Sequence, residues 1–184
     1  AEIASALDGS VLAGADILRV SAVTGAGIAG LETRLIEEAE SRPEQAAGGT
    51  FRMAIDRSFT LAGSGTVVTG TIVSGTVRVG DHVMVLPQRL EARVRTIHAH
   101  NRPAEQGHAG QRCALNLAGP GISKDAIARG DWLLDPSQPL VSARFDAQLS
   151  LLASETHPIR QWMPVHLHIG TSDAMARIVL LDTD

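Results

Sequence analysis

Residues 56–70 read DRSFTLAGSGTVVTG, and this stretch decides the fold. It lies in a region from Thr50 to about Pro136 in which apolar and polar residues alternate with a period of two. The same alternation recurs at residues 90–95 and 112–117, and glycines separate the segments. Many short strands with glycine turns and almost no helix predict a closed antiparallel barrel.

Two local features refine this barrel. Gly80-Asp81 stands between two valine-rich segments, which is a hairpin turn signal. We therefore expect a hairpin at residues 77–85, and Ser123–Arg129 is the one place in the region where a short helix could form.

The residues before the barrel have a different period. Ile3–Val11 and Ile28–Ala39 carry apolar residues at helical spacing, and Asp16–Val20 between them reads as a short strand. Pro43 ends the second helix because proline cannot continue the hydrogen-bond ladder. The polar, small residues Glu44–Gly49 then predict a linker.

Alternation resumes after the barrel. Ala143–Leu151 predicts one long strand, Val165–Ile169 a second, and Ile178–Leu180 a third. Because three strands do not close a barrel, we expect the start of a second one. The predicted domains are residues 1–48, 49–138 and 139–184.

Composition narrows the classes of function. The 184 residues are 44% hydrophobic and carry a net charge of −4, which is typical of a folded chain and not of a polycationic nucleic-acid binder. Cys113 is the single cysteine, which excludes an internal disulfide and fits a reducing, cytoplasmic location. No apolar run is long enough to cross a membrane. With no Tyr, three Phe and two Trp, a stacking platform for bases is not expected.

A glycine-rich turn gives a competing hypothesis. Gly25–Gly30 reads GAGIAG, a literal GxGxxG that follows the predicted strand and opens a helix. That order is typical of a dinucleotide-binding unit. A doubly wound sheet needs further helix-strand crossovers, however, and only short alternating strands follow Asp56.

The stretch at 56–70 resembles the signature of the second domain of translational GTPases, the family of elongation factor Tu. Val79–Asp81, Ala109–Arg112 and Ala128–Asp131 resemble further pieces of that family in the same order. The resemblance implies a mainly β fold: a helix-strand-helix remnant of an α/β G domain, the closed antiparallel barrel, and a partial second barrel.

Ser21-Ala22-Val23-Thr24-Gly25 resembles the last guanine-recognition loop of GTPases. By that resemblance, the backbone N–H of Ala22 would meet guanine and the Ser21 hydroxyl would brace the loop. The alternative is an ordinary strand-turn-helix junction with a threonine cap.

Three residues narrow the resemblance. Where the aminoacyl pocket of elongation factor Tu carries two adjacent acids and an asparagine, this chain has Asp56, Arg57 and Arg112. This pattern is similar to that of the selenocysteine-specific elongation factors, as is the segment Thr96–Asn101. A selenol is more acidic than a thiol, so selenocysteine is mostly anionic at neutral pH, whereas serine is neutral. Two fixed guanidinium groups would favour the anion, by an amount on the order of a hundredfold.

Strand parity tests this pocket. Met53 and Ile55 should face the core, so Asp56 should face outward, as should Arg112. Arg57 has the opposite parity, and a buried arginine would be costly, so we expect a bulge or strand end that turns it outward. The alternative is a set of ordinary surface arginines making weak salt bridges.

The resemblance also implies a function. The longer protein would bind GTP with Mg²⁺ and deliver selenocysteinyl-tRNA to the ribosome, with a C-terminal region outside this sequence reading an mRNA hairpin. The motifs that hold and hydrolyse GTP are outside this sequence too, so we expect no catalytic residue, no cofactor and no enzymatic activity in the chain itself. The alternative is the same barrel in a sulfate-activating GTPase subunit or an initiation factor, acting as a partner-binding module.

Three further residue pairs are weaker candidates. Arg93 and Arg95 share a strand face and could meet tRNA phosphates, as could His166 and His168. Paired histidines, including His98 with His100, can bind zinc. With no third ligand nearby in sequence, we expect no metal site.

Overall fold

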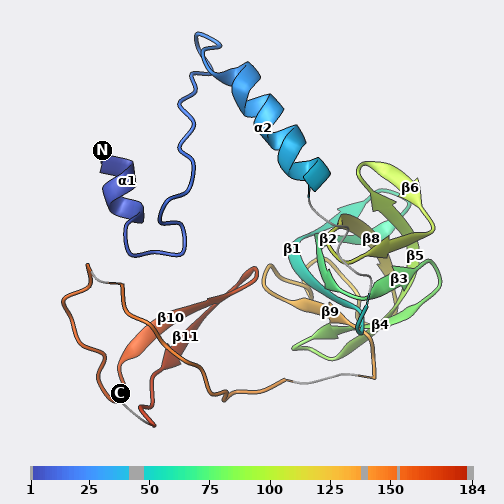
Figure 1. Cartoon of the computed structure of the whole chain (residues 1–184). Helices are drawn as coiled ribbons and strands as arrows, with labels where there is room; N and C mark the ends of the chain where they lie inside the picture. Colours follow the sequence, from blue (N-terminus) through green and yellow to red (C-terminus); the bar gives the residue numbers. More distant parts are fainter. Residues whose placement is uncertain (1, 42–47, 138–140, 153, 182–184) are drawn as a thin grey trace. The chain divides into compact units, whose positions relative to one another are not determined.

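The computed structural model describes residues 2–41, 48–137, 141–152 and 154–181 (Figure 1). The chain divides into two compact units, Ala1–Glu44 with Asp146–Ile159, and Gln45–Phe145 with Arg160–Asp184. Residues 44–47 of the predicted linker and the predicted boundary at 138/139 lie outside the described residues. No described helix combines the length and apolar character needed to cross a membrane.

The secondary structure is mostly strand. The elements are α1 (Glu2–Leu7), α2 (Ile28–Ser41), β1 (Arg52–Leu61), β2 (Gly65–Ser74), β3 (Thr76–Arg78), β4 (His82–Leu86), β5 (Leu90–Ala99), β6 (Arg102–Ala104), β7 (Gln106–His108), β8 (Arg112–Ala118), β9 (Trp132–Leu134), β10 (Pro164–Ile169) and β11 (Ser172–Arg177).

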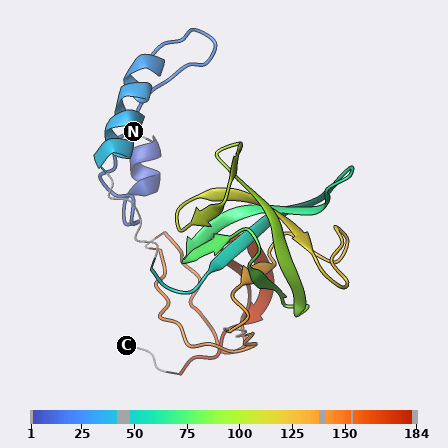
Figure 2. The same cartoon turned by 90° about the vertical axis from the view of Figure 1, so that its right-hand side faces the viewer.

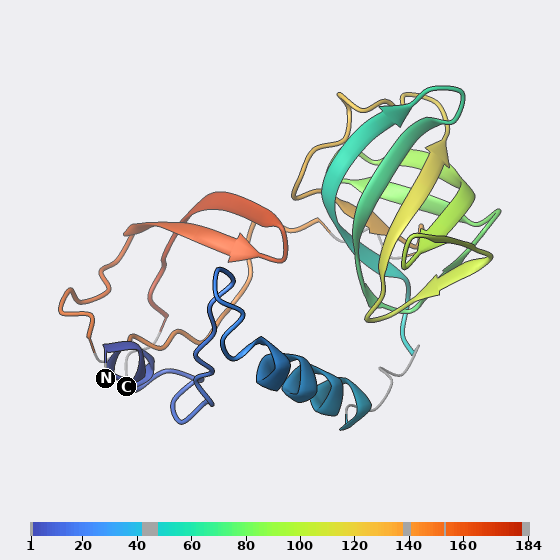
Figure 3. The same ribbon diagram turned by 90° about the horizontal axis from the view of Figure 1, so that it is seen from above.

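The predicted closed barrel is confirmed. Strands β4, β9, β1, β2, β8 and β5 follow one another as hydrogen-bonded neighbours, and a further β4–β5 pairing closes the ring. All of these pairings are antiparallel. Figures 2 and 3 show the strands wrapping around a common interior. Closure leaves these strands no free edge in the ring.

Apolar residues at alternate positions fill the interior. Met53, Ile55, Val68 and Leu115 have no exposed side-chain surface, and Cys113 and Leu117 are 2% exposed. The alternation predicted for β1 and β8 therefore points to the core as expected.

A bulge interrupts β1 next to the predicted pocket. Ile55 pairs with Gly70 and Arg57 pairs with Thr69, so Asp56 is the extra residue. Gly70 is required at this point, because a Cβ there would lie 2.0 Å from the carbonyl oxygen of Ala54. The predicted bulge is thus confirmed, one residue before Arg57, and it shifts every later side chain of β1 by one position.

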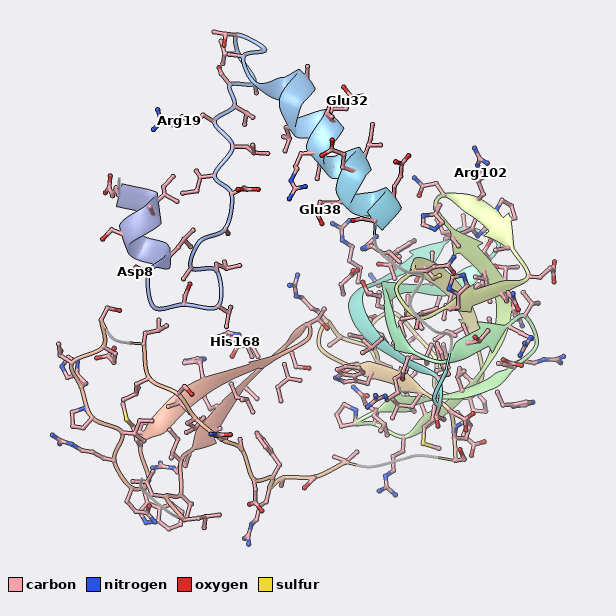
Figure 4. All side chains as sticks on the ribbon, viewed as in Figure 1. Asp8, Arg19, Glu32, Glu38, Arg102 and His168 are labelled. Carbon is pink, nitrogen blue, oxygen red and sulfur yellow. The ribbon has the colours of Figure 1, made fainter. Side chains whose placement is uncertain are left out.

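The first unit, Ala1–Glu44 with Asp146–Ile159, is called the helical unit below. It lacks the strand predicted at Asp16–Val20. The segment is not assigned as a strand, and its apolar side chains are exposed. A strand forms only with a hydrogen-bonded neighbour, and the described residues of this unit offer none. Without this strand, the described residues of the unit provide no sheet for a dinucleotide-binding fold. Helix α2 forms as predicted, with Glu32 and Glu38 projecting from it (Figure 4).

Two local predictions within the barrel were wrong. The turn at Gly80-Asp81 forms, with Asp81 N donating to Arg78 O at 3.1 Å, but β3 pairs with β7 and β4 pairs with β5 and β9. Strand β4 has β5 and β9 as its two neighbours in the closed ring, so it does not pair with β3 in a local hairpin. Ser123–Arg129 forms turns instead of a helix; Ile127 is buried in the core there.

Two strands predicted after the barrel were also wrong. Residues 141–152 form no strand, and Phe145, Leu149 and Leu151 are more than half exposed. The third strand, predicted at Ile178–Leu180, does not form there, because β11 covers Ser172–Arg177 and ends just before it. Strands β10 and β11 form the two-stranded ribbon seen in Figure 3. Alternation specifies which residues can share a face, but a strand also needs a partner.

Candidate functional site

The structure brings Asp56 and Arg112 together on the outside of the barrel. Arg112 Nη2 donates to both carboxylate oxygens of Asp56, at 2.8 and 2.7 Å. Strand β2 separates β1 from β8, and its Thr69 donates through Oγ1 to Asp56 Oδ1 at 2.6 Å. These three strands therefore position a hydrogen-bonded carboxylate with a guanidinium beside it. We call Asp56, Arg57 and Arg112 the guanidinium cluster.

Arg112 keeps donor capacity for a ligand. Its side chain is 57% exposed, against 20% for Asp56, and both contacts to the carboxylate come from one nitrogen. A guanidinium carries five N–H donors. The donors on Nε and Nη1 make no hydrogen bond within the described residues.

Arg57 is the second cation of the cluster. The bulge aligns it with Thr69, and its side chain is exposed. It makes no hydrogen bond or ion pair with any described residue, yet its positive charge acts on Asp56. The cluster thus combines one carboxylate with two guanidinium charges and has a net charge of +1.

The cluster changes the acidity of Asp56. Burial raises the pKa of this carboxyl, but the hydrogen bonds from Thr69 and Arg112, together with the positive charges of Arg112 and Arg57, outweigh burial. The net pKa is lowered from 3.8. Asp56 is therefore ionised at neutral pH and holds Arg112 in place.

The guanine-loop candidates lie in the helical unit. Thr24 N donates to Ser21 Oγ at 3.2 Å, and Ser21 N donates to Ala26 O at 2.9 Å. Gly27 approaches the Arg19 carbonyl so closely that a Cβ would lie 2.2 Å from its oxygen. The Ser21 hydroxyl thus braces the loop, and Ala22 is exposed at its tip.

Arg93 and Arg95 line a separate depression. Both are exposed on β5, and a register shift places Arg95 at a bulge. An open depression of about 510 Å³ is lined by these arginines together with Val79, Gly80, Val94, Ala118 and Gly119. Arg93 Nε donates to Gly80 O at 3.2 Å. None of the lining residues belongs to the guanidinium cluster.

The histidine pairs differ from one another. His166 and His168 stack with ring centroids 6.3 Å apart, and His166 Nδ1 lies 3.1 Å from Asp173 Oδ1. The hydrogen bond to His166 lowers the pKa of Asp173. His100, by contrast, lies in the turn after β5 with a φ of 52°, outside the strand that carries His98. No group of three or more metal-ligating residues gathers among the described residues.

Sequence reasoning missed Thr69, which fixes the carboxylate of Asp56. Its signal was available, because Thr69 lies within the deciding stretch at 56–70. Its contact with Asp56 could not be predicted, since it depends on the register shift between β1 and β2.

Comparisons with known proteins agree with the barrel fold. The family model for elongation factor Tu domain 2 matches residues 65–134, which is most of the barrel. The selenocysteine-specific elongation factor of Escherichia coli K12 is 42% identical over 169 residues, covering 91% of this chain and 26% of that protein. That of Desulfomicrobium baculatum is 36% identical over 183 residues, covering 100% and 28%.

The chain is homologous to the selenocysteine-specific elongation factors along nearly its whole length.

A solved structure of such a factor shows the same fold. The apo form of translation elongation factor SelB from Methanococcus maripaludis superposes with a TM-score of 0.78 at 26% identity, covering 99% of this chain and 41% of that one. The chain spans about a quarter of the length of the curated selenocysteine-specific factors described above.

Proposed function

We propose that this chain is the part of a GTP-dependent elongation factor that recognises the amino acid of selenocysteinyl-tRNA. The guanidinium cluster carries the proposal: one ionised carboxylate is bound by the exposed side chain of Arg112, whose other donors have no hydrogen-bond partner among the described residues, and the exposed Arg57 is its neighbour in sequence. Such a site favours an anionic side chain over a neutral one. The homology to selenocysteine-specific factors supports the same ligand.

Within this proposal each residue has a role. Arg57 and the free donors of Arg112 would bind the selenolate. Asp56 would hold Arg112 and accept a hydrogen bond from the substrate's α-amino group. Arg93, Arg95, His166 and His168 would meet phosphates of the tRNA. The domain boundaries at 48 and 138 belong to the same proposal.

The longer protein would bind GTP with Mg²⁺, and Ser21 and Ala22 would form the last part of its guanine site. It would act in the cytoplasm with the ribosome and a selenoprotein mRNA hairpin. The chain by itself would have no GTPase activity.

The test is an equilibrium binding comparison with the full-length protein and a GTP analogue. We expect tighter binding of selenocysteinyl-tRNA than of seryl-tRNA and a smaller difference in Arg112→Ala. Arg78→Ala, which removes an exposed arginine from β3, is the matched control. Equal affinities in the wild type would exclude selenocysteine recognition and favour a partner-binding barrel.

A further inference from the structure

The tip of the β10–β11 hairpin contacts the β1 bulge that presents the guanidinium cluster. Thr171 Oγ1 donates to the carbonyl oxygen of Ile55 at 2.7 Å, and Ser172 Oγ donates to that of Gly130. Gly170 also packs closely, because a Cβ there would lie 3.3 Å from the Trp132 ring. Three consecutive residues at the hairpin tip thus contact β1, β9 and the turn before β9.

The Ile55 carbonyl is the last hydrogen-bonded backbone group before the bulge residue Asp56. Its oxygen also accepts from Gly130 N at 3.0 Å, so it has two donors. A peptide unit is planar and turns as one body. The direction of the Ile55 C=O therefore sets the direction of the Asp56 N–H, and with it the start of the bulge.

The side chain of the bulge residue Asp56 is held by Thr69 and Arg112, but its backbone lacks a partner in the β1–β2 ladder. Asp56 has no partner in the β1–β2 register, since Ile55 pairs with Gly70 and the next pair is Arg57 with Thr69. An extra residue of this kind lacks the ladder hydrogen bonds that fix ordinary strand residues. The contact from Thr171 supplies an anchor at the peptide immediately before it.

We propose that Thr171 is a positioning residue for the guanidinium cluster. Its hydroxyl fixes the Ile55–Asp56 peptide and thereby the directions in which Asp56 and Arg57 project. Preference for an anionic amino acid then depends on a side chain of the β10–β11 hairpin, 115 positions after Asp56 in the sequence. This inference rests on the proposed function for its ligand.

Two substitutions separate the hydroxyl from the packing. Thr171→Val keeps the shape and removes the donor, whereas Thr171→Ser keeps the donor. In the full-length protein with a GTP analogue, we expect Thr171→Val to lower the ratio of selenocysteinyl-tRNA to seryl-tRNA affinity by about threefold to tenfold, since one hydrogen bond is at stake. Affinity for seryl-tRNA should stay unchanged, and Thr171→Ser should keep the wild-type ratio.

Amide hydrogen exchange in the same variants gives a second readout that needs no tRNA. Peptides covering residues 55–58 should exchange faster in Thr171→Val and at the wild-type rate in Thr171→Ser, while β8 peptides stay unchanged. An unchanged affinity ratio in Thr171→Val, with a clear preference in the wild type, would overturn the positioning role. A wild type without preference would defeat the proposed function instead, and the exchange rates would then decide whether Thr171 anchors the bulge.

Discussion

The net charge of the guanidinium cluster should set its preference for an anion. Asp56, Arg57 and Arg112 sum to +1 at neutral pH. Arg57→Gln lowers this sum to 0 and shortens the side chain, and Asp56→Asn raises the sum to +2 with no change in side-chain size. We therefore expect the two substitutions to shift the preference for selenocysteinyl-tRNA over seryl-tRNA in opposite directions.

The size of the effect follows from the exposure of the site. A unit charge about 5 Å from a selenolate contributes about 3 kcal/mol at an effective dielectric constant of 20 and about 0.8 kcal/mol in water. Arg112 is 57% exposed and Asp56 is 20% exposed, so the site lies between these limits. An intermediate value of about 1.5 kcal/mol corresponds to about a tenfold change in the affinity ratio.

The assay is competition between the two aminoacyl-tRNAs for the full-length protein with a GTP analogue at low and moderate salt. Arg57→Gln should lower the ratio about tenfold and Asp56→Asn should raise it, since each changes one unit charge. Arg78→Gln is the control for the loss of an exposed arginine. Both effects should weaken as salt screens the exposed charges.

One result would refute this reasoning. If Arg57→Gln and Asp56→Asn change the ratio in the same direction, shape or folding governs the preference and net charge does not. If neither substitution changes the ratio while the wild type prefers selenocysteine, the cluster is an ordinary surface ion pair.

Three further predictions concern acidity, packing and nucleotide chemistry. Thr69→Val removes a donor to Asp56 and should raise the pKa of that carboxyl, measurable by NMR titration of the chain. Because the pKa of Asp56 is lowered in the folded state, this carboxylate stabilises the fold above its unfolded pKa of about 3.9, and the stabilisation is lost as the pH falls through the folded pKa. If Thr69→Val has the same free energy of unfolding as the wild type at every pH, the role given to Thr69 is contradicted. Gly70→Ala should lower the free energy of unfolding by about 3 kcal/mol in urea titrations, because its Cβ would meet the Ala54 carbonyl; Gly63→Ala, in open space with a φ of 78°, should cost about 1 kcal/mol, and equal costs would argue against the clash. The chain should not turn over GTP, and measurable hydrolysis of radiolabelled GTP would contradict the proposed role.

The sequence predicted the barrel and the three residues of the guanidinium cluster. Alternation at Met53 and Ile55, and again at Cys113 and Leu117, indicated which faces are buried. The same parity required a bulge near Arg57 if that arginine was to reach solvent. These inferences succeed because a strand has a fixed period of two, so one buried residue determines the faces of its neighbours.

Predictions from local sequence patterns were wrong where the result depended on which segment a strand could pair with. Asp16–Val20 and residues 143–151 carry strand-like sequence but find no hydrogen-bonding neighbour among the described residues. The Gly80-Asp81 turn forms, yet its flanking strands pair elsewhere because ring closure buries more apolar surface than a single hairpin could.

The sequence by itself determined the period, the core faces and the residues Asp56, Arg57 and Arg112. Only the tertiary structure decided that Arg112 and Thr69 converge on one carboxylate, and that Thr171 anchors the peptide before it. The physical reason is that periodicity arises within one strand, whereas these contacts depend on the register between strands and on a hairpin distant in sequence.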